Sequence, residues 1–531
     1  MRSAPAIAEG DGWVMTHLKR LRLRALAPFR LLVVAALVLA GCHREPVAEP
    51  AAATSVISIS QRNEPSDLDP ALAPLPDDFF IIRALSEGLV LPAMPGDSGP
   101  TPGAASSWDV SADRLVWTFH LRPGLKWSNG EPLVAQDFVD SFRRVRSPST
   151  PAPRAELFDP VSEFSAPDPY TVVARLNQPN DHLLEYAASG PWIPVNLRVV
   201  SRWGRAWTRP EHFVGNGPYV LAEWTPHQRI VVRRNPLFRD PALVRVGELR
   251  FLHFDDGNAE DRAFRTGQVD VTMSVPVDRL PAYRQENPSP LHSAPLAETR
   301  YLAFNTQRPP LDRPEVRRAL SLAIDRDALV RDVLRAGQQP AYSLGPNLNG
   351  ASLSQSGDAE NSLSPSNEAR RILAAAGFPD GRGFPALELA GWSGNAGNQV
   401  LQAVQQMWRE RLGINVTLVS REARVHLAAL QNGQFDIALV ARIPWVEDPR
   451  DVLDTFASGN PNNYPHWQDT LYDRLMRSGD LLAAEARLDA ALPGTPLYFN
   501  RHNWLMRARV GGWRENGRWE RSYLSLRVEG R

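Results

Sequence analysis

The sequence has a single cysteine, Cys42, in 531 residues. One thiol cannot form an internal disulfide, and a metal site built from thiolates needs more than one of them. The sequence also lacks an excess of either charge, because Lys and Arg number 59 and Asp and Glu number 59. It therefore offers neither the basic surface of a nucleic-acid-binding protein nor a polybasic membrane patch.

The common catalytic and nucleotide-binding signatures are missing as well. No G-x-S-x-G, H-E-x-x-H, P-loop or G-x-G-x-x-G pattern occurs, and the 11 histidines are scattered. One acidic cluster, Asp255, Asp256, Glu260 and Asp261, lacks EF-hand spacing and adjoins Arg262. We interpret it as a solvated, salt-bridged loop rather than a calcium site, and we expect neither a metal nor an organic cofactor.

No apolar run is long enough to span a membrane, but a shorter one precedes the cysteine. The apolar run of residues 31–41 follows the basic stretch 17–24. A membrane helix needs about 20 apolar residues. A basic stretch, a short apolar run and small residues at its end are typical of a secretory signal. The signal has an ordinary length if translation starts at Met15, so we infer that Met15 is the true start.

The end of this signal predicts a lipid anchor. Residues 39–42, Leu-Ala-Gly-Cys, resemble the lipobox of bacterial lipoproteins, in which the cysteine is acylated and becomes the mature N-terminus. The alternative is a small buried cysteine in a core helix. Several acyl chains on one residue give stable anchoring. We therefore predict a signal peptide over 1–42, lipidation of Cys42, a Pro/Ala/Glu-rich tether over 43–53, and a periplasmic protein anchored to the inner or outer membrane.

The rest of the chain shows both strand and helix periodicity. Alternation predicts strands over 115–122, 170–176 and 229–233. After Asp312, a candidate cap, one apolar face continues to Leu334 and predicts a single helix that ends before Gly337. Further along, the pattern predicts a helix over 400–412, a strand over 414–419, a helix near 422–431 and a strand over 435–440. This alternation indicates βαβ units and a largely parallel sheet.

One segment carries a family resemblance. Residues 117–144 read as a strand, a tight Asn129-Gly130 turn and a helix. They closely resemble the hallmark segment of solute-binding protein family 5, the oligopeptide- and dipeptide-binding proteins of ABC importers. Further similar strings follow in the family's order at 63–65, 68–70, 87–89, 215–219, 234–236, 301–305, 316–326, 407–408, 412–414 and 435–436. We interpret Trp117, Phe119 and Trp127 as core residues rather than ligand platforms.

The resemblance implies an α/β, three-lobed class II periplasmic binding protein with a hinge of two crossover connections. Its implied lobes are lobe I (54–89, 212–298 and 494–531), lobe II (90–211) and lobe III (299–493). We expect such a protein to be a monomer, and we do not expect it to be an enzyme. It captures a peptide or peptide-like solute between its lobes. It delivers that solute to an ABC permease with its ATPases.

Two alternatives remain open at this point. The same fold could bind an oligosaccharide or another non-peptide cargo, because tryptophans stack on sugars. A different class of protein, an exported lipid-anchored hydrolase, would use a pair of carboxylates for acid and base work.

The resemblance also points to a ligand site. In the best-known oligopeptide binders, a Trp-x-Ala-Asp-Tyr-like string occupies the first half of the stretch that is 441–449 here, and its aspartate pairs with the ligand's ammonium group. Alignment on Asp448-Pro449 places Trp445 at that aspartate and Arg442 at the tryptophan. An indole face returns about 0.5 to 2 kcal/mol against a desolvation cost of several kcal/mol. We therefore predict that the ligand's amine is not held in this way.

Other interpretations of the same stretch are possible. A slip of one or two residues would let Glu447 or Asp448 bind the amine, or the cargo would have no free amine. Trp445 could also pack beneath the cleft floor. By their position relative to the family's cleft strands, we expect four further residues to line or adjoin the cleft: Gly391, Trp392, Met273 and Ser274.

Overall fold

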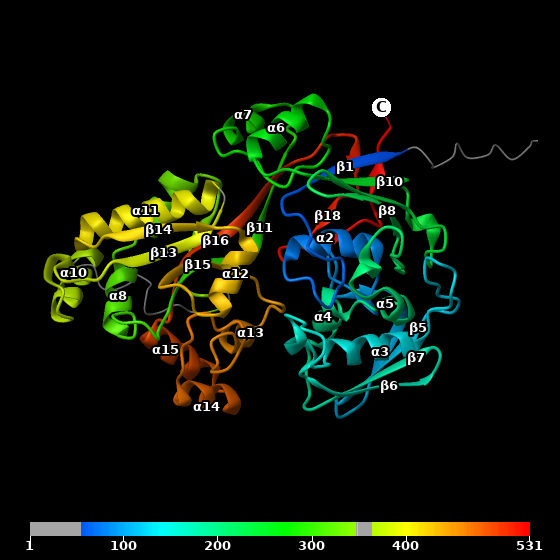
Figure 1. Ribbon diagram of the computed structural model, residues 1–531, viewed down its shortest axis with the longest axis horizontal. Coiled ribbons are helices and arrows are strands. Elements are labelled where there is room, and N and C mark those ends of the chain that lie inside the picture. Colours follow the sequence, from blue (N-terminus) through cyan, green and yellow to red (C-terminus); the bar gives the residue numbers. More distant parts are fainter. Residues whose placement is uncertain (1–54, 347, 349–363, 394, 531) are drawn as a thin grey trace, which may run out of the picture. The chain divides into compact units, whose positions relative to one another are not determined.

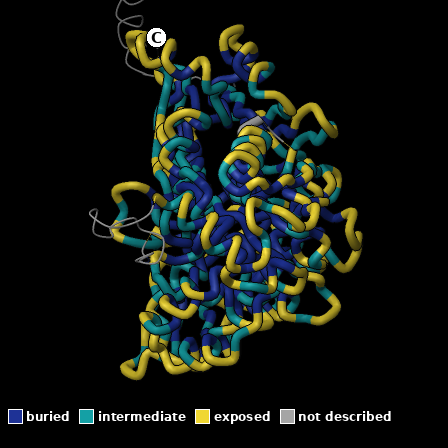
Figure 2. The backbone as a smooth tube through the Cα atoms, turned by 90° about the vertical axis from the view of Figure 1, so that its left-hand side faces the viewer, coloured by how far each residue is buried: buried dark blue, intermediate teal, exposed yellow. Residues whose placement is uncertain are grey.

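The computed structural model describes residues 55–346, 348, 364–393 and 395–530. The predicted signal peptide, Cys42 and the tether over 43–53 lie outside these residues. Residues 52–531 form one compact unit. Within the described part of the chain, no helix combines the length and the apolar character needed to cross a bilayer. Buried backbone fills the interior and exposed segments lie mostly at the periphery (Figure 2).

The first sheet belongs to lobe I. Its order is β1 (Val56–Gln61), β10 (Glu248–His253), β9 (Arg229–Arg234) and β8 (Tyr219–Thr225). Only the β1–β10 pair is parallel. Ile57 and Ile59 of β1 share a hydrophobic core with Ile81 and Leu85 of helix α2 (Pro76–Leu85). Pro76 and two aspartates in the first turn favour the start of this helix.

Close packing explains why the family-like string 215–219 contains glycine at position 217. A Cβ atom on Gly217 would lie 2.3 Å from the backbone nitrogen of Ser86, which is far inside van der Waals contact. Only glycine allows the 215–219 string to approach the end of α2 this closely.

The second sheet belongs to lobe II and is wholly antiparallel. Its order is β4 (Ala105–Val110), β5 (Val116–Leu121), β7 (Thr171–Leu176) and β6 (Val161–Asp168). Helix α3 (Ala135–Val145) contributes Phe138 and Phe142 to the core beneath this sheet. Trp117, Phe119 and Trp127 are buried in the same core, which confirms their interpretation as core residues.

The third sheet belongs mainly to lobe III. Its order is β12 (Gln339–Pro340), β16 (Gly494–Leu505), β11 (Leu291–Phe304), β15 (Ile437–Arg442), β13 (Leu387–Trp392) and β14 (Val416–Arg421). Strand β13 is parallel to β14 and β15, and the other pairs are antiparallel. The expected parallel sheet is therefore right for the βαβ units with α11 (Asn395–Leu412) and α12 (Ala423–Gln431) and wrong elsewhere, because β11 and β16 run in opposite directions.

The predicted single helix after Asp312 is also wrong. The segment forms α8 (Pro314–Leu322) and then α9 (Arg326–Ala328), which continues into a π-helical turn over Leu329–Leu334. Between them, the Asp325 side chain accepts a hydrogen bond of 2.9 Å from the Ala328 backbone nitrogen. Aspartate favours the N-cap over the helix interior, so a second helix starts here although the apolar face continues.

Two long neighbouring strands connect lobes I and III (Figure 1). Strands β11 and β16 contain 14 and 12 residues, and they pair with each other on both sides of an irregularity between Pro295 and Thr299. Beyond β16, Met506 bridges to Val271, which in turn bridges to Ile59 of β1. The predicted boundary after residue 298 falls inside β11, and the one after 493 falls at the start of β16. These strands are the two crossover connections of the hinge.

The remaining elements complete the lobes. They are β2 (Val90–Leu91), β3 (Thr101–Pro102), α4 (Leu183–Ala187), α5 (Leu197–Trp203), α6 (Gly257–Thr266), α7 (Leu280–Gln285), α10 (Pro365–Ala375), α13 (Pro449–Asp454), α14 (Thr470–Ser478), α15 (Leu481–Ala491), β17 (Val510–Gly511), β18 (Arg514–Glu515), β19 (Arg521–Ser522) and β20 (Arg527–Val528).

Candidate functional site

A cavity of about 1040 Å³ lies between the lobes. This volume is at the upper end of the range for small-molecule sites. All three lobes contribute to its wall: Asn63 and Asp77 come from lobe I, Arg154 and Ser189 from lobe II, and Trp392 and Trp445 from lobe III. A ligand inside it would therefore contact every lobe.

Several side chains bridge the lobes around this cavity. Between lobes II and III, His182 Nε2 lies 3.1 Å from Asp448 Oδ2, and Asn462 Nδ2 donates a bond of 3.3 Å to Glu156 Oε1. Between lobes III and I, the Arg424 guanidinium donates to the carbonyl oxygen of Glu64. These contacts hold the lobes together in a closed arrangement.

Five of the six predicted cleft residues line the cavity: Trp445, Arg442, Trp392, Met273 and Ser274. The sixth, Gly391, is buried in β13 and adjoins the cavity through its neighbour Trp392. A Cβ atom on Gly391 would lie 2.9 Å from Leu401 Cδ1 of α11, so this position faces the core of lobe III. Their role in ligand binding stays a prediction.

Trp445 lines the cavity and also contacts lobe II, so it is not simply packed beneath the cleft floor. Its ring packs against the core of lobe II, and the Arg154 guanidinium of that lobe lies 4.7 Å above the ring centroid. Its backbone nitrogen donates a bond of 3.1 Å to Asp451 Oδ2. A cation from the protein itself therefore covers one face of this indole.

Arg442 is held by its own lobe. Its Nε donates a bond of 2.8 Å to Thr455 Oγ1, and its guanidinium forms an ion pair with the buried carboxylate of Asp451. Because Asp451 compensates its charge, Arg442 shapes the cavity wall and is not a free anion-binding group.

The two carboxylates that a slipped alignment would offer to a ligand amine point elsewhere. Neither Glu447 nor Asp448 is among the described residues that line the cavity. Asp448 Oδ1 accepts a bond of 2.8 Å from the Arg450 backbone nitrogen and so caps α13, while Oδ2 faces His182. In this closed arrangement Asp448 is used for a helix cap and an interlobe contact.

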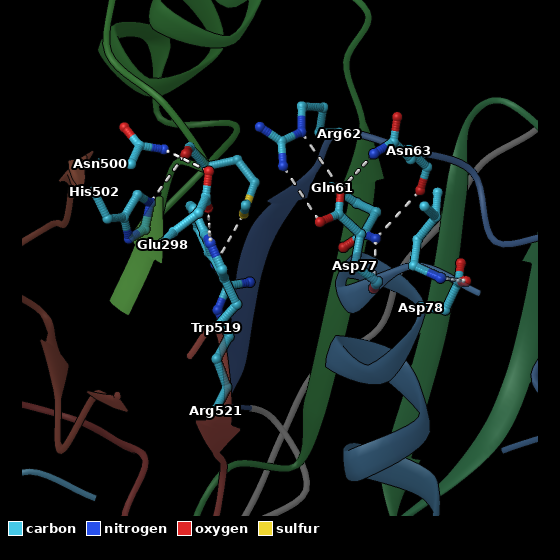
Figure 3. Close-up of polar contacts among 12 residues, drawn as sticks. Gln61, Arg62, Asn63, Asp77, Asp78, Glu298, Asn500, His502, Trp519 and Arg521 are labelled. Atoms are coloured by element: carbon cyan, nitrogen blue, oxygen red, sulfur yellow. Dashed lines mark hydrogen bonds and ion pairs between the residues drawn. The ribbon is translucent and has the colours of Figure 1, made fainter. Parts of the chain in front are cut away.

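Three arginine–carboxylate ion pairs of the cavity wall make up what we call the paired group: Arg62 with Asp77, Arg83 with Glu520, and Arg300 with Glu298. Figure 3 shows the Arg62–Asp77 pair and, separately, Glu298 with its hydrogen-bond donors. Asp77 Oδ2 accepts a bond of 2.6 Å from Asn63 Nδ2, and the charge of Asp77 raises the pKa of Arg62. Glu298 accepts bonds of 3.0 Å from Asn500 Nδ2 and 2.8 Å from Trp519 Nε1. These contacts fix both carboxylates in the cavity wall.

Two other arginines, Arg154 and Arg424, form what we call the unpaired group. No carboxylate among the described residues lies within 4.0 Å of either guanidinium. Each donates instead to a carbonyl oxygen, Arg154 to Pro74 at 2.9 Å and Arg424 to Glu64. The Nε atom of each is buried without a described hydrogen-bond partner. Burial lowers the pKa of Arg154.

Arg501 also lines the cavity without a carboxylate partner, but it differs from the unpaired group. Its Nε donates a bond of 2.7 Å to Ser293 Oγ in an exposed position. Water can therefore solvate this guanidinium.

The unpaired group acts on one buried carboxyl group, Asp78. Its Oδ2 accepts a bond of 3.0 Å from the Leu75 backbone nitrogen, and its Oδ1 has no described partner. Burial raises the pKa of Asp78 to about 7, and the charges of Arg424 and Arg154 oppose that rise. Both guanidinium groups are therefore close enough to Asp78 to influence its ionisation, although neither pairs with it.

The acidic cluster near residue 255 is not a solvated loop, which corrects that interpretation. Asp256 caps α6 by accepting from the Ala259 backbone nitrogen at 3.1 Å. Glu260 and Asp261 are buried on that helix. Glu260 accepts a bond of 2.6 Å from Ser274 Oγ, and Asp261 lies 3.1 Å from Arg265 Nε. No group of three or more potential metal ligands occurs among the described residues.

Sequence reasoning missed Arg154, Arg424 and Glu298. Arg154 lies in the loop between α3 and β6, and Arg424 lies at the start of α12, where a basic residue normally faces solvent. Neither position has a periodicity or motif that would mark it. Their place in the cavity wall is visible only once the three lobes are packed together in the structure.

Comparison with known proteins gives a consistent result. Residues 99–464 match the model of the bacterial extracellular solute-binding proteins, family 5. The chain is 30% identical to the periplasmic oligopeptide-binding protein OppA of Escherichia coli, over 85% of this chain and 88% of that protein. It is 29% identical to the periplasmic murein peptide-binding protein MppA (85% and 89% covered) and 29% identical to the probable deoxycholate-binding periplasmic protein YgiS (88% and 92%), both of Escherichia coli.

Solved structures extend the likeness to three dimensions. A complex of Haemophilus influenzae OppA with the peptide RPPGFSPFR has a TM-score of 0.82 at 25% identity, with 90% of this chain and 99% of that chain covered. One structure of Escherichia coli MppA has a TM-score of 0.81 at 27% identity, with 90% and 98% covered. The unliganded open form of MppA has a TM-score of only 0.63, with 90% and 97% covered. The lobes are thus arranged more as in the peptide complex than as in the open form.

Proposed function

The chain belongs to family 5 of the bacterial extracellular solute-binding proteins, and on that premise we propose that it captures a peptide or peptide-like solute between its lobes and delivers it to an ABC importer. The observation that carries this proposal is the cavity of about 1040 Å³ enclosed by all three lobes and bridged by their side chains. A ligand that touches every lobe favours the closed state by its differential affinity for the two states.

We also propose that the protein works in the periplasm as a monomer held to a membrane by acylated Cys42. The lipobox-like residues 39–42 and the preceding apolar run support this. The relatives named above are periplasmic proteins. Replacement of Cys42 by Ala should release the protein from the membrane fraction or leave it unprocessed. Unchanged membrane association and unchanged electrophoretic mobility would contradict the anchor.

We propose binding without turnover, a metal or a cofactor. Asp77 and Glu298, two carboxylates of the cavity wall, are each paired with a guanidinium group. A carboxylate that is held in an ion pair is part of the cavity wall and is less available to a substrate. The named relatives are binding proteins, which supports the same assignment.

A second candidate is a non-peptide carboxylate. YgiS, one of the relatives, is described as a probable deoxycholate-binding protein. Arg154 covers one face of Trp445 at 4.7 Å, and Arg300 covers one face of Trp392 at 4.5 Å. These two indoles therefore have less free surface for stacking on a sugar, while the cavity keeps guanidinium groups for an acid.

Small-angle X-ray scattering with a random tripeptide library tests the main proposal. We expect the radius of gyration to fall when the library is added, because ligand binding closes the lobes. Mass spectrometry of the library should show no cleavage. Cleaved peptides would support the hydrolase instead, and an unchanged radius with peptides and with deoxycholate would contradict solute capture.

A further inference from the structure

We propose that Arg154 and Arg424 bind a carboxylate group of the ligand, so that this cavity selects an anionic group rather than an amine. The proposal deepens solute capture and rests on it. It assigns a ligand chemistry to two residues that come from lobes II and III and whose guanidinium groups form no ion pair with a carboxylate of the described chain.

Arg154 has the donors for such a group. A guanidinium carries five N–H donors, and the described chain accepts one bond from Arg154, at Pro74 O. Its Nε is buried without a partner, and the residue lines the cavity. The indole of Trp445 holds the guanidinium plane in place from one side. A buried charge without a counter-charge is costly, and a ligand carboxylate would remove that cost.

Arg424 faces the same region from the opposite lobe. It lies in the first turn of α12, donates to Glu64 O, and keeps its own buried Nε without a partner. Both arginines line the cavity, and both donate to backbone carbonyls of lobe I, Arg154 to Pro74 O and Arg424 to Glu64 O. An anion between them would join lobe II to lobe III. Its binding would therefore favour the closed state directly.

The same geometry disfavours a ligand ammonium group. Arg154 already occupies a face of Trp445, so a second cation there would meet a like charge. Two cavity carboxylates, Glu64 and Glu422, accept hydrogen bonds from the chain, so fewer of their lone pairs are open to a ligand ammonium group. Glu64 Oε1 accepts from Trp224 Nε1 at 2.6 Å, and Glu422 accepts from the Arg424 backbone nitrogen at 2.9 Å as the cap of α12. Guanidinium groups bind carboxylates by parallel hydrogen bonds, which makes a carboxylate the matching ligand group.

The test uses one random tripeptide library in four forms, with a free or acetylated N-terminus combined with a free or amidated C-terminus. Native mass spectrometry measures the fraction of protein bound at equal library concentration, and deoxycholate serves as an amine-free carboxylate. We expect C-terminal amidation to weaken binding at least 10-fold and N-terminal acetylation to weaken it less than 3-fold.

Variants assign the effect to the proposed residues. Arg154→Gln and Arg424→Gln should each reduce the preference for acid over amide to less than 3-fold, whereas Arg154→Lys should keep part of it. Arg202→Gln is the matched control, because Arg202 also stacks on an indole, Trp203, at 5.0 Å in lobe II but does not line the cavity. Melting temperatures of all variants show whether each one folds.

The outcomes separate the two proposals. If acid and amide forms bind equally to the unaltered protein, the carboxylate site is wrong while peptide capture stands. If the preference survives Arg154→Gln and Arg424→Gln, the assigned residues are wrong. If no library binds but deoxycholate binds and requires Arg154, peptide capture fails and the carboxylate site stands. If neither binds, both proposals fail.

Discussion

The paired and unpaired groups line the same cavity but are held in different ways. Glu298 forms an ion pair with Arg300, whereas Arg154 donates to a carbonyl oxygen, stacks on an indole and has no ion-pair partner among the described residues. A charge that is compensated within the chain fixes the shape of the wall and stays there when the ligand leaves. A charge that is left uncompensated gains most from what enters the cavity. The comparison teaches which charged residues to regard as structure and which as candidates for recognition.

The largest expected effect breaks the paired group. Glu298→Ala leaves the Arg300 charge without a partner and takes the acceptor away from Asn500 and Trp519. We expect the free energy of unfolding to fall by about 5 kcal/mol, at the upper end of the range for breaking a buried pair. Denaturant titration measures it.

The unpaired group supplies the control for that experiment. Arg154→Gln removes an uncompensated charge, so the free energy of unfolding should change by less than about 1 kcal/mol or increase. A loss as large as that of Glu298→Ala would show that Arg154 is structural, and the distinction between the two groups would then be wrong.

The second largest effect is the pH dependence of the unfolding free energy that Asp78 causes. The charges of the unpaired group modulate it. Burial raises the pKa of Asp78 to about 7, above its unfolded value. Between about pH 4 and 7 the folded state therefore holds a proton that the unfolded state has lost, so stability is highest below pH 4 and falls as the pH rises to 7. The fall from this group amounts to about 4 kcal/mol.

Two variants isolate that contribution. Asp78→Asn keeps the acceptor for the Leu75 backbone nitrogen and should flatten the difference between the unfolding free energies at pH 5 and pH 8.5. Arg154→Gln should move the fall to higher pH, because a positive charge that favours the Asp78 carboxylate is gone. An unaltered pH profile in Asp78→Asn would mean that another group titrates.

A third and smaller effect is expected when a member of the unpaired group is given an ion-pair partner. Trp445→Asp places a carboxylate beside Arg154, so the guanidinium gains an internal partner and becomes paired. We expect the preference for acid over amide forms of the tripeptide library to fall about 10-fold, or about 1.4 kcal/mol. Trp445→Phe keeps an aromatic face and should keep the preference. Equal results for the two variants would contradict the explanation by charge.

The smallest effect concerns a bridge that needs no ligand. His182 and Asp448 join lobes II and III at 3.1 Å, but about a third of each side chain is exposed. Pairs of this kind contribute about 0.2 to 1 kcal/mol. His182→Gln should therefore weaken tripeptide binding by about fivefold at most, for acid and amide forms alike. A selective loss of one form would place His182 in recognition.

The sequence predicted those strands and turns that depend only on neighbouring residues, such as an alternating pattern or an Asn-Gly pair. The alternation over 115–122 became β5, and Gly130, with a φ of +90°, makes the turn that Asn129-Gly130 indicated. The helix after Asp312 was wrong because periodicity alone does not show a break that a capping aspartate creates. The parallel sheet was only partly right, since strand direction depends on how β11 and β16 return through the hinge.

The candidate site was predictable on one side only. Trp445 and Arg442 follow β15, and their position in a recognisable stretch placed them at the cavity. Arg154 comes from a loop of another lobe, and its contact with Trp445 depends on lobe closure rather than on any local pattern. The sequence therefore led to the prediction that no aspartate binds a ligand amine here, but it did not reveal the cation that lies beside Trp445.

The bonds from Arg154 to Pro74 O and from Arg424 to Glu64 O have an evolutionary consequence. A carbonyl oxygen is present whatever side chain its residue carries. Substitutions at these two acceptor positions can therefore accumulate without removing the acceptor, as long as the backbone keeps its path. Because Pro74 and Glu64 themselves line the cavity, a change of their side chains can alter the fit of a solute while the two arginines keep their acceptors.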